Sequence, residues 1–148
     1  MLGAYYKNQQ GKEIKFLDAI DIYTEAGKKR MIGNTLYDMN IPDIGHVVGF
    51  ENHSGKTFLN GDVKPLAKVI KGYGNNGEDK TEGAMYKNVF CSYSHGALLP
   101  KNPKLADHIL KTTLNQKYGK DINMEKLDDS LENKAHDSVE KMVIGSKA

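Results

Sequence analysis

The hydrophobic pattern of this chain changes its period once, close to residue 100, and that change sets the class of fold. Before it, apolar residues come in short runs typical of β-strands. After it they recur every three or four positions, as on one face of an α-helix. Strands are predicted at residues 16–23, 30–37, 46–50, 56–59, 66–70 and 89–93, with a loop at 51–55. Short strands followed by two helices predict an α/β or α+β arrangement in one domain.

Both helices are delimited by residues with known preferences for helix ends. Asn102 followed by Pro103 predicts an N-cap with proline at the first helical position, and Gly119 predicts the C-terminal end. The apolar face of this helix carries Leu105, Ile109, Leu110, Thr113 and Leu114. A second amphipathic helix is predicted to stop at Gly145. Its aligned residues are Leu127, Leu131, Ala135, Val139 and Val143.

Charge and cysteine content exclude several classes of protein. The net charge is +2, from 21 Lys and Arg against 19 Asp and Glu spread along the chain, so the basic stripe of a nucleic-acid-binding protein is not expected. No apolar run approaches the ~18 residues of a membrane span, and the first residues lack the features of a signal peptide. A single cysteine, Cys91, excludes an internal disulfide and a multi-cysteine metal site. A cytoplasmic protein without a transmembrane segment is predicted.

Two glycine-containing motifs resemble nucleotide-binding loops but lack the context that such loops need. Residues 72–77 have the spacing G-x-G-x-x-G after a predicted strand, yet the acidic residues 78–83 that follow are expected neither to begin a helix nor to attract phosphate. Residues 54–57 match only the end of a P-loop, because Phe50 stands where its first glycine is required. We interpret the first motif as a structured loop and the second as a chance match.

The remaining histidines do not suggest a metal site. His46, Glu51 and His53 lack the spacing of a helical metal-binding pair, so we interpret them as polar loop residues. His108 and His136 lie at polar or boundary positions of the predicted helices and are expected to be solvated.

His95 is a candidate catalytic residue, although its position alone is at least as typical of a structural histidine in a turn. It stands where the strand at 89–93 ends and precedes Gly96 and a compact loop, and catalytic groups collect at strand ends in α/β sheets. Cys91 is not expected to be its nucleophile, because positions four apart in a strand are separated by roughly 13 Å. Cys91 also lacks the sharp strand-to-helix turn that exposes a nucleophile, so we expect a small buried hydrophobic residue.

Three segments in register, residues 48–57, 72–83 and 93–103, resemble the cobyric-acid-synthase-like family of class I glutamine amidotransferase domains. Within that family they are most similar to the GatD-like glutaminase subunits of lipid II isoglutaminyl synthase. The similarity extends through the final helices, and residues 50–53 and 99–102 favour this peptidoglycan branch.

The resemblance implies an α/β fold of which this chain holds a part. We expect a partial class I glutamine amidotransferase fold, a flavodoxin-like sheet with an antiparallel extension, with residues 1–148 as the C-terminal part of a single domain. In the family a nucleophilic cysteine lies in a glycine-flanked elbow that runs into a helix, and residues 2–6 match the continuation of that helix. The N-terminal strands and the nucleophile elbow are therefore expected to be missing. Such a sheet would expose apolar surface, so poor solubility is predicted.

The resemblance also implies a reaction. The family's cysteine thiolate attacks the side-chain amide of glutamine, a histidine takes up and returns the proton, and water hydrolyses the thioester to glutamate. His95 corresponds to that acid and base, and Arg30 to the arginine that binds the α-carboxylate of glutamine. Ala97 replaces the glutamate that usually follows the histidine, as is common in this branch. Lys15 and Asp18 stand where the family more often has glycines.

The resemblance finally implies a partner. The ammonia is expected to pass to a MurT-like Mur-ligase subunit, which uses ATP to amidate the D-glutamate of the peptidoglycan precursor. No cofactor or metal is expected on this chain, and without the nucleophile it is predicted to be inactive alone. Two alternatives stay open. One is a non-catalytic fragment that docks on a MurT-like ligase, and the other is a glutaminase domain of a cobyrinate-type amidotransferase.

Overall fold

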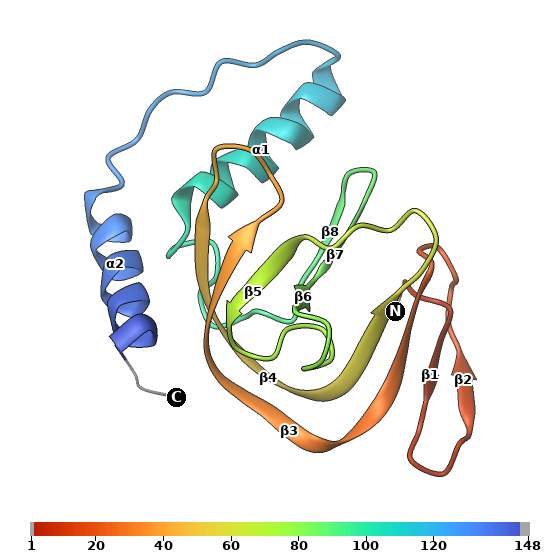
Figure 1. Cartoon of the computed structure of the whole chain (residues 1–148). Helices are drawn as coiled ribbons and strands as arrows, with labels where there is room; N and C mark the ends of the chain where they lie inside the picture. Colours follow the sequence, from red (N-terminus) through yellow and green to blue (C-terminus); the bar gives the residue numbers. More distant parts are fainter. Residues whose placement is uncertain (1, 146–148) are drawn as a thin grey trace.

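The computed structural model describes residues 2–145 and is built around one long, bent ribbon of two antiparallel strands. This ribbon is formed by β3 (Ile22–Met39) and β4 (His46–Leu59), which pair almost from end to end with an irregularity between Ala26 and Met31. In Figure 1 the ribbon curves through the molecule, with β1 and β2 beside one end and both helices beside the other.

Smaller strands extend the ribbon at both ends. They are β1 (Tyr5–Lys7), β2 (Glu13–Lys15), β5 (Ala67–Lys71), β6 (Thr81–Glu82), β7 (Ala84–Tyr86) and β8 (Val89–Cys91), and the helices are α1 (Pro103–Tyr118) and α2 (Ser130–Gly145). β1 runs parallel to β3, whereas the other pairings of the described sheets are antiparallel. A mixed sheet with two helices confirms the predicted α/β class.

Three predictions of secondary structure were wrong in detail. Residues 16–21 form no strand, because the chain bends there with Asp18 at φ +52° and the amides of Ala19 and Ile20 donate to the carbonyl of Leu2. The predicted loop at 51–55 is part of β4, since every one of its residues except Ser54 lies opposite a named partner on β3. Residues 5–7 are β1 rather than the continuation of a helix.

The helix ends also differ in part from the prediction. α1 begins at Pro103 and is capped at its C-terminal end by Gly119, which is left-handed at φ +65° and donates its amide to the carbonyl of Asn115, as predicted. Asn102 stands at the N-cap position, but its side chain does not cap the helix. α2 begins at Ser130, so Leu127 precedes it, and Leu131 is 72% exposed. The predicted apolar face is therefore used only towards the end of α2.

Two clusters of buried residues hold the helices to the sheet. The larger joins the sheet end around Tyr37, Val47 and Val69 to Leu105 of α1. The smaller joins Leu36 and Val48, on the opposite face of the β3–β4 ribbon, to Val143 of α2. Each helix thus covers one face of the same ribbon, and the ribbon is the element that positions everything else.

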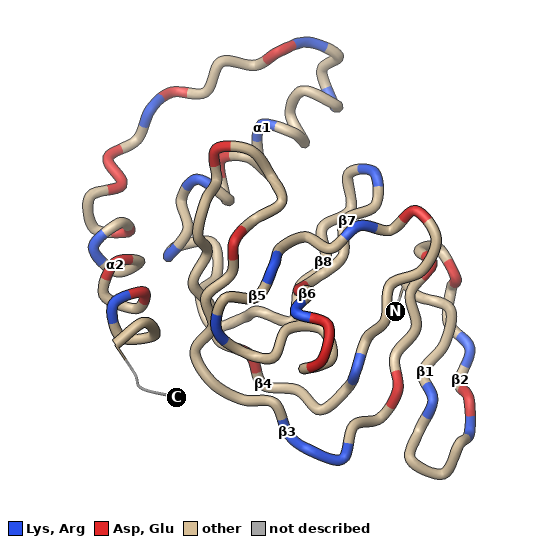
Figure 2. The backbone as a smooth tube through the Cα atoms, in the orientation of Figure 1, with Lys and Arg blue, Asp and Glu red and all other residues tan. Residues whose placement is uncertain are grey.

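Basic and acidic residues are interspersed along the described chain, as Figure 2 shows. The ribbon, the glycine-rich loop at residues 72–83 and both helices each carry charges of both signs. Within residues 2–145, no helix has the length and apolar character needed to cross a membrane.

Candidate functional site

The β3–β4 ribbon presents one face that is only partly covered. Residues opposite one another in an antiparallel pair point to the same face, and alternate residues of a strand share it. We call this the outer face; it consists of Ile32, Asn34 and Leu36 of β3 and Val48, Phe50 and Asn52 of β4. α2 covers the end formed by Leu36 and Val48, and Asn34 donates to the sulfur of Met142 at 3.5 Å. Beyond that point the face is open, and Ile32 is 52% exposed.

The structure places His95 beside this open stretch. Its backbone amide donates to the carbonyl of Phe50 at 2.9 Å, and the two residues form an isolated antiparallel bridge. Their rings meet edge to face, with centroids 5.8 Å apart and planes at 78°. Because bridge partners share a face, the exposed imidazole lies on the outer face next to Phe50.

Arg30 reaches the same face from β3. Its Nε donates to the side-chain oxygen of Asn52 at 2.6 Å, and the side chain is otherwise exposed. Asn52 lies two residues after Phe50 on β4, a separation of about 7 Å at a strand's rise per residue. The two predicted site residues therefore contact neighbouring side chains of one strand face: His95 contacts Phe50, and Arg30 contacts Asn52.

A buried carboxylate that the sequence analysis did not single out holds the segment before His95. Glu82 is 1% exposed, and its Oε1 accepts hydrogen bonds from the Ser92 hydroxyl at 2.6 Å and the Tyr93 amide at 3.0 Å. Burial raises the pKa of this carboxyl, and the nearby charge of Glu51 raises it further. Its position in an acidic loop gave no hint of this contact, because the residues it binds are ten positions or more away.

Tyr93, in the same segment, packs against β4. Its ring stacks on His53 at a centroid distance of 3.7 Å, and its hydroxyl shares a 2.7 Å hydrogen bond with that of Thr57. Gly49 lies against the next residue: a Cβ at that position would be 2.5 Å from the hydroxyl oxygen of Ser94 and would have to displace its side chain. We call the face of the ribbon opposite the outer face the inner face. Tyr93 and Ser94 contact the inner face of β4, at His53 and Gly49, whereas His95 contacts the outer face at Phe50.

The glycine-rich loop is a structured loop, as predicted, and not a phosphate site. Glu51, which is fully buried, accepts hydrogen bonds from the amides of Tyr73 at 2.7 Å and Gly74 at 3.0 Å. These are the amides that a dinucleotide would need, and residues 78–83 form bends and a short strand rather than a helix. Asp79 accepts hydrogen bonds from Thr81 and Asn76; burial opposes them, but together they lower its pKa.

The histidines considered as metal ligands lie apart. His46 is bonded through Nδ1 to Glu140 of α2 at 2.5 Å, whereas His53 lies 3.7 Å from Glu51 on the inner face. Among residues 2–145, no group of three or more His, Cys, Asp or Glu side chains is arranged to hold a metal ion.

Cys91 is half-buried and lies away from the outer face. It borders a small cavity of about 140 Å³ with mostly apolar walls, which include Ile22 and Ala84. Burial raises the pKa of its thiol, which disfavours the reactive thiolate. This agrees with the interpretation of Cys91 as a small hydrophobic residue.

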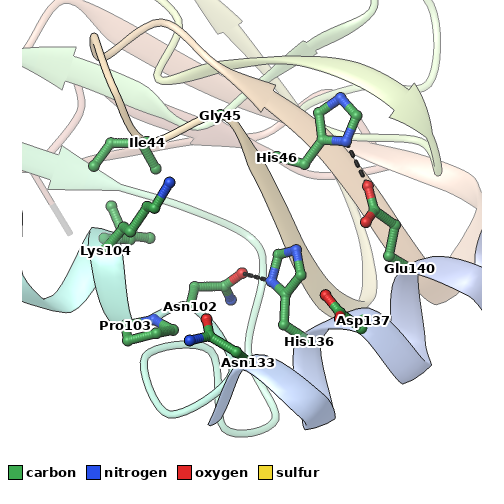
Figure 3. Close-up of a pocket in the computed structure, with 11 residues that line it drawn as sticks. Ile44, Gly45, His46, Asn102, Pro103, Lys104, Asn133, His136, Asp137 and Glu140 are labelled. Carbon is green, nitrogen blue, oxygen red and sulfur yellow. Dashed lines mark hydrogen bonds and ion pairs between the residues drawn. The ribbon is translucent and has the colours of Figure 1, made fainter. Parts of the chain in front are cut away.

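A larger hollow of about 320 Å³ lies between α2 and the start of α1 (Figure 3). His136 of α2 points into it and contacts the Lys101 carbonyl at 2.9 Å and the Asn102 side-chain oxygen at 3.1 Å. The expectation that His136 is solvated was therefore wrong, because α2 folds back over the residues that precede α1. His108 was also expected to be solvated, but its ring lies edge-on to Phe90 at 5.9 Å.

Comparison with known proteins gives this geometry a family context. Residues 1–103 match the model of the CobB/CobQ-like glutamine amidotransferase domain. The chain is 42% identical over 133 residues to the lipid II isoglutaminyl synthase (glutamine-hydrolyzing) subunit GatD of Streptococcus pneumoniae, covering 88% of this chain and 50% of that protein. It is 40% identical over 116 residues to the subunit of the same name from Staphylococcus aureus, covering 78% of this chain and 46% of that protein.

Shorter matches belong to a second kind of enzyme. A probable cobyric acid synthase of Methanothermobacter thermautotrophicus is 40% identical over 86 residues, covering 54% of this chain and 16% of that protein. The chain spans about half the length of the two GatD relatives that it matches.

Proposed function

The chain belongs to the family of CobB/CobQ-like glutamine amidotransferase domains, and on this premise we propose that it supplies the histidine and the substrate-binding arginine of a glutaminase. This glutaminase hydrolyses glutamine to glutamate and ammonia, and the ammonia serves a lipid II isoglutaminyl synthase that amidates the D-glutamate of the peptidoglycan precursor. One observation carries the proposal: His95 and Arg30 contact Phe50 and Asn52, two neighbours on the outer face of β4.

In this proposal His95 moves the proton. Its imidazole takes the proton of a cysteine thiol, the thiolate attacks the amide carbon of glutamine, and the imidazolium returns the proton to the departing ammonia. The same imidazole then takes a proton from water as it attacks the thioester, which releases glutamate and the thiolate. The exposed position of His95 on an open face suits a group that must meet both a thiol and water.

Arg30 has the geometry to hold the substrate. Its Nε is engaged by Asn52, which fixes the plane of the guanidinium group. The two Nη groups form the edge that binds the α-carboxylate of glutamine through paired hydrogen bonds.

The thiol comes, in this proposal, from polypeptide outside residues 1–148, because Cys91 is half-buried beside an apolar cavity. We therefore expect the purified chain to release no glutamate from glutamine above background. Measurement of glutamate by a coupled dehydrogenase assay tests this. Robust turnover that Cys91→Ala abolishes would contradict it.

The roles of His95 and Arg30 are tested by complementation. The part of the pneumococcal relative that this chain does not match is supplied as a separate polypeptide, and glutamine hydrolysis is measured. We expect His95→Ala to lower kcat by about 10²–10⁴-fold. We expect Arg30→Ala to act mainly on KM, by roughly 10–100-fold, from the loss of a charged hydrogen bond. His108→Ala and Lys29→Ala are the matched controls, and full activity of His95→Ala would rule out the proposed role.

The ligase partner is part of the same proposal. We expect a MurT-like Mur-ligase subunit, which consumes the ATP, so that this chain needs no cofactor and works in the cytoplasm. Leu127, Leu131 and Ile144 around α2 are each at least 66% exposed, and this apolar surface favours docking on another protein. Co-purification with such a ligase, without ammonia release in the complemented system, would favour the alternative of a non-catalytic docking module.

A further inference from the structure

The loop that carries His95 is attached to a buried acid by a short chain of hydrogen bonds. Glu82 Oε1 accepts from the hydroxyl of Ser92 and the amide of Tyr93, at 2.6 and 3.0 Å. The Ser92 oxygen in turn accepts from the amide of Ser94 at 2.8 Å. The next residue is His95, whose amide donates to Phe50. Each backbone amide from 93 to 95 thus has a defined acceptor.

The fold brings Glu82 to this loop by a close approach of two backbones. β6 pairs with β5, with Glu82 opposite Ala67. Gly83 then adopts φ +64°, and a Cβ there would overlap the carbonyl oxygen of Cys91. A residue with a side chain at 83 would force the two segments apart. The contact between residues 82–83 and 91–93 is therefore built into the backbone.

The burial of Glu82 has a cost that its hydrogen bonds only partly offset. The side chain is almost wholly removed from water, and its Oε2 has no hydrogen-bond partner. A buried carboxyl with an unsatisfied oxygen destabilises a fold relative to an apolar residue of similar size. Its value to the protein therefore lies elsewhere than in stability.

We infer that Glu82 is the positioning residue for His95, setting the path of residues 92–94 so that the imidazole lies over Phe50 on the outer face. This rests on the proposed function for the role of His95, but the geometry it describes does not. Glu82 contacts the loop and not the substrate. An acceptor oxygen at the Oε1 position is what the loop requires, so glutamine at position 82 should preserve it.

Nuclear magnetic resonance of the full 148-residue chain tests this. The readouts are the ring-current shift that Phe50 imposes on the His95 imidazole and the exchange rates of the amides of Ser94 and His95. In Glu82→Met, which removes the acceptor with little change of volume, we expect the His95 shift to collapse and both amides to exchange at least ~10-fold faster. Glu82→Gln should keep both readouts near those of the unchanged chain.

Two further variants make the result unambiguous. Ser92→Ala leaves Glu82 in place and cuts the link to Ser94, so it should reproduce the changes at Ser94 and His95 even if Glu82→Met fails to fold. Glu78→Ala removes an exposed carboxylate of the same loop, whose partner is Lys56, and should change neither readout. The His136 resonance is the internal reference.

The inference is overturned if the His95 shift and the amide exchange rates stay unchanged in Ser92→Ala, or in a folded Glu82→Met. It is also overturned if Glu82→Gln disturbs them as much as Glu82→Met does. None of these readouts involves glutamine. An unchanged loop together with a strong activity loss in His95→Ala would reject only this inference, and a disturbed loop with no effect of His95→Ala would reject only the proposed function.

Discussion

Two residues with positive φ angles form the turn that follows the candidate catalytic histidine. Gly96 and Ala97 both have positive φ angles, at +72° and +61°. Glycine adopts this region freely, whereas the Cβ of alanine costs roughly 1–2 kcal/mol there. Strained backbone is common at functional sites, and here it turns the chain away immediately after His95.

Replacement of Ala97 by glycine should therefore stabilise the protein. Ala97→Gly removes the Cβ penalty, while the extra freedom of glycine in the unfolded chain returns part of it, so we expect a gain of up to about 1 kcal/mol. The free energy of unfolding in urea measures it. Ala106→Gly, inside α1, should lower stability by about 1 kcal/mol. A loss in both variants would contradict the strain at Ala97.

The site residues themselves were accessible from sequence only in part. His95 was a candidate from its place after a strand, its role and Arg30 came from a resemblance, and the structure shows that both contact side chains on the outer face of β4. Glu82 was missed because its partners are remote in sequence, so no spacing rule identifies it. Local sequence patterns identify candidate side chains, but contacts between segments that are distant in sequence determine which of these side chains lie together.

At the scale of elements, the side chain of Asn102 forms the hydrogen bonds to β4 that a neighbouring strand would otherwise form at Val48. Asn102 is 3% exposed and accepts from the amide of Val48 at 2.9 Å, while its Nδ2 donates to the Val48 carbonyl at 2.8 Å and the Leu98 carbonyl at 2.6 Å. The sequence predicted an N-cap because Asn-Pro precedes a helical pattern. The Asn102 side chain does not cap α1, because its amide group is already bonded to the backbone amide and carbonyl of Val48 on β4.

Removal of this side chain should weaken the fold. Asn102→Ala leaves the amide and carbonyl of Val48 without partners in a buried position, so we expect a loss of about 2–4 kcal/mol. Chemical unfolding measures the difference. Asn133→Ala, an exposed asparagine on the wall of the same hollow, is the control and should change stability by less than about 0.5 kcal/mol. An Asn102→Ala protein as stable as this control would rule out the bridging role.

Helices and strands were predictable where local sequence signals determine their ends, and not where pairing with another strand determines them. α1 was found because its proline start and glycine end are local signals. β4 was divided into two strands because residues 51–55 are polar, yet the long partner strand β3 keeps the ladder going through them. Glu51 is buried and only Ser54 of these residues is exposed, so the polarity of the segment was no evidence against strand structure.

For the whole molecule, the buried carboxyl of Glu82 makes stability depend on pH. Its folded pKa lies above the ordinary 4.5 because burial disfavours the charge. The folded state therefore holds this proton more tightly than the unfolded chain does. The corresponding stabilisation is complete below about pH 4.5 and is lost as the pH rises through the folded pKa.

Glu82→Gln should remove this dependence. We expect the free energy of unfolding of the unchanged chain to fall from about pH 4.5 upwards, and the variant to show a flatter profile over the same range. Unfolding in urea at a series of pH values from 4 to 8 measures the difference between the two. Glu78→Gln, whose side chain is 59% exposed, serves as the control and should follow the unchanged chain. Parallel profiles for Glu82→Gln and the unchanged chain would mean that the carboxyl titrates normally.

Gly49 has no side chain and takes no part in chemistry, yet the hydroxyl of Ser94 lies where its Cβ would be. An alanine at this position would have to displace the side chain of Ser94, the residue that precedes His95. A systematic survey of variants scored by enzymatic output would therefore rank position 49 with the residues that handle the substrate. Position 49 would be sensitive to replacement because the space of a side chain is already occupied, and not because the residue acts in the reaction.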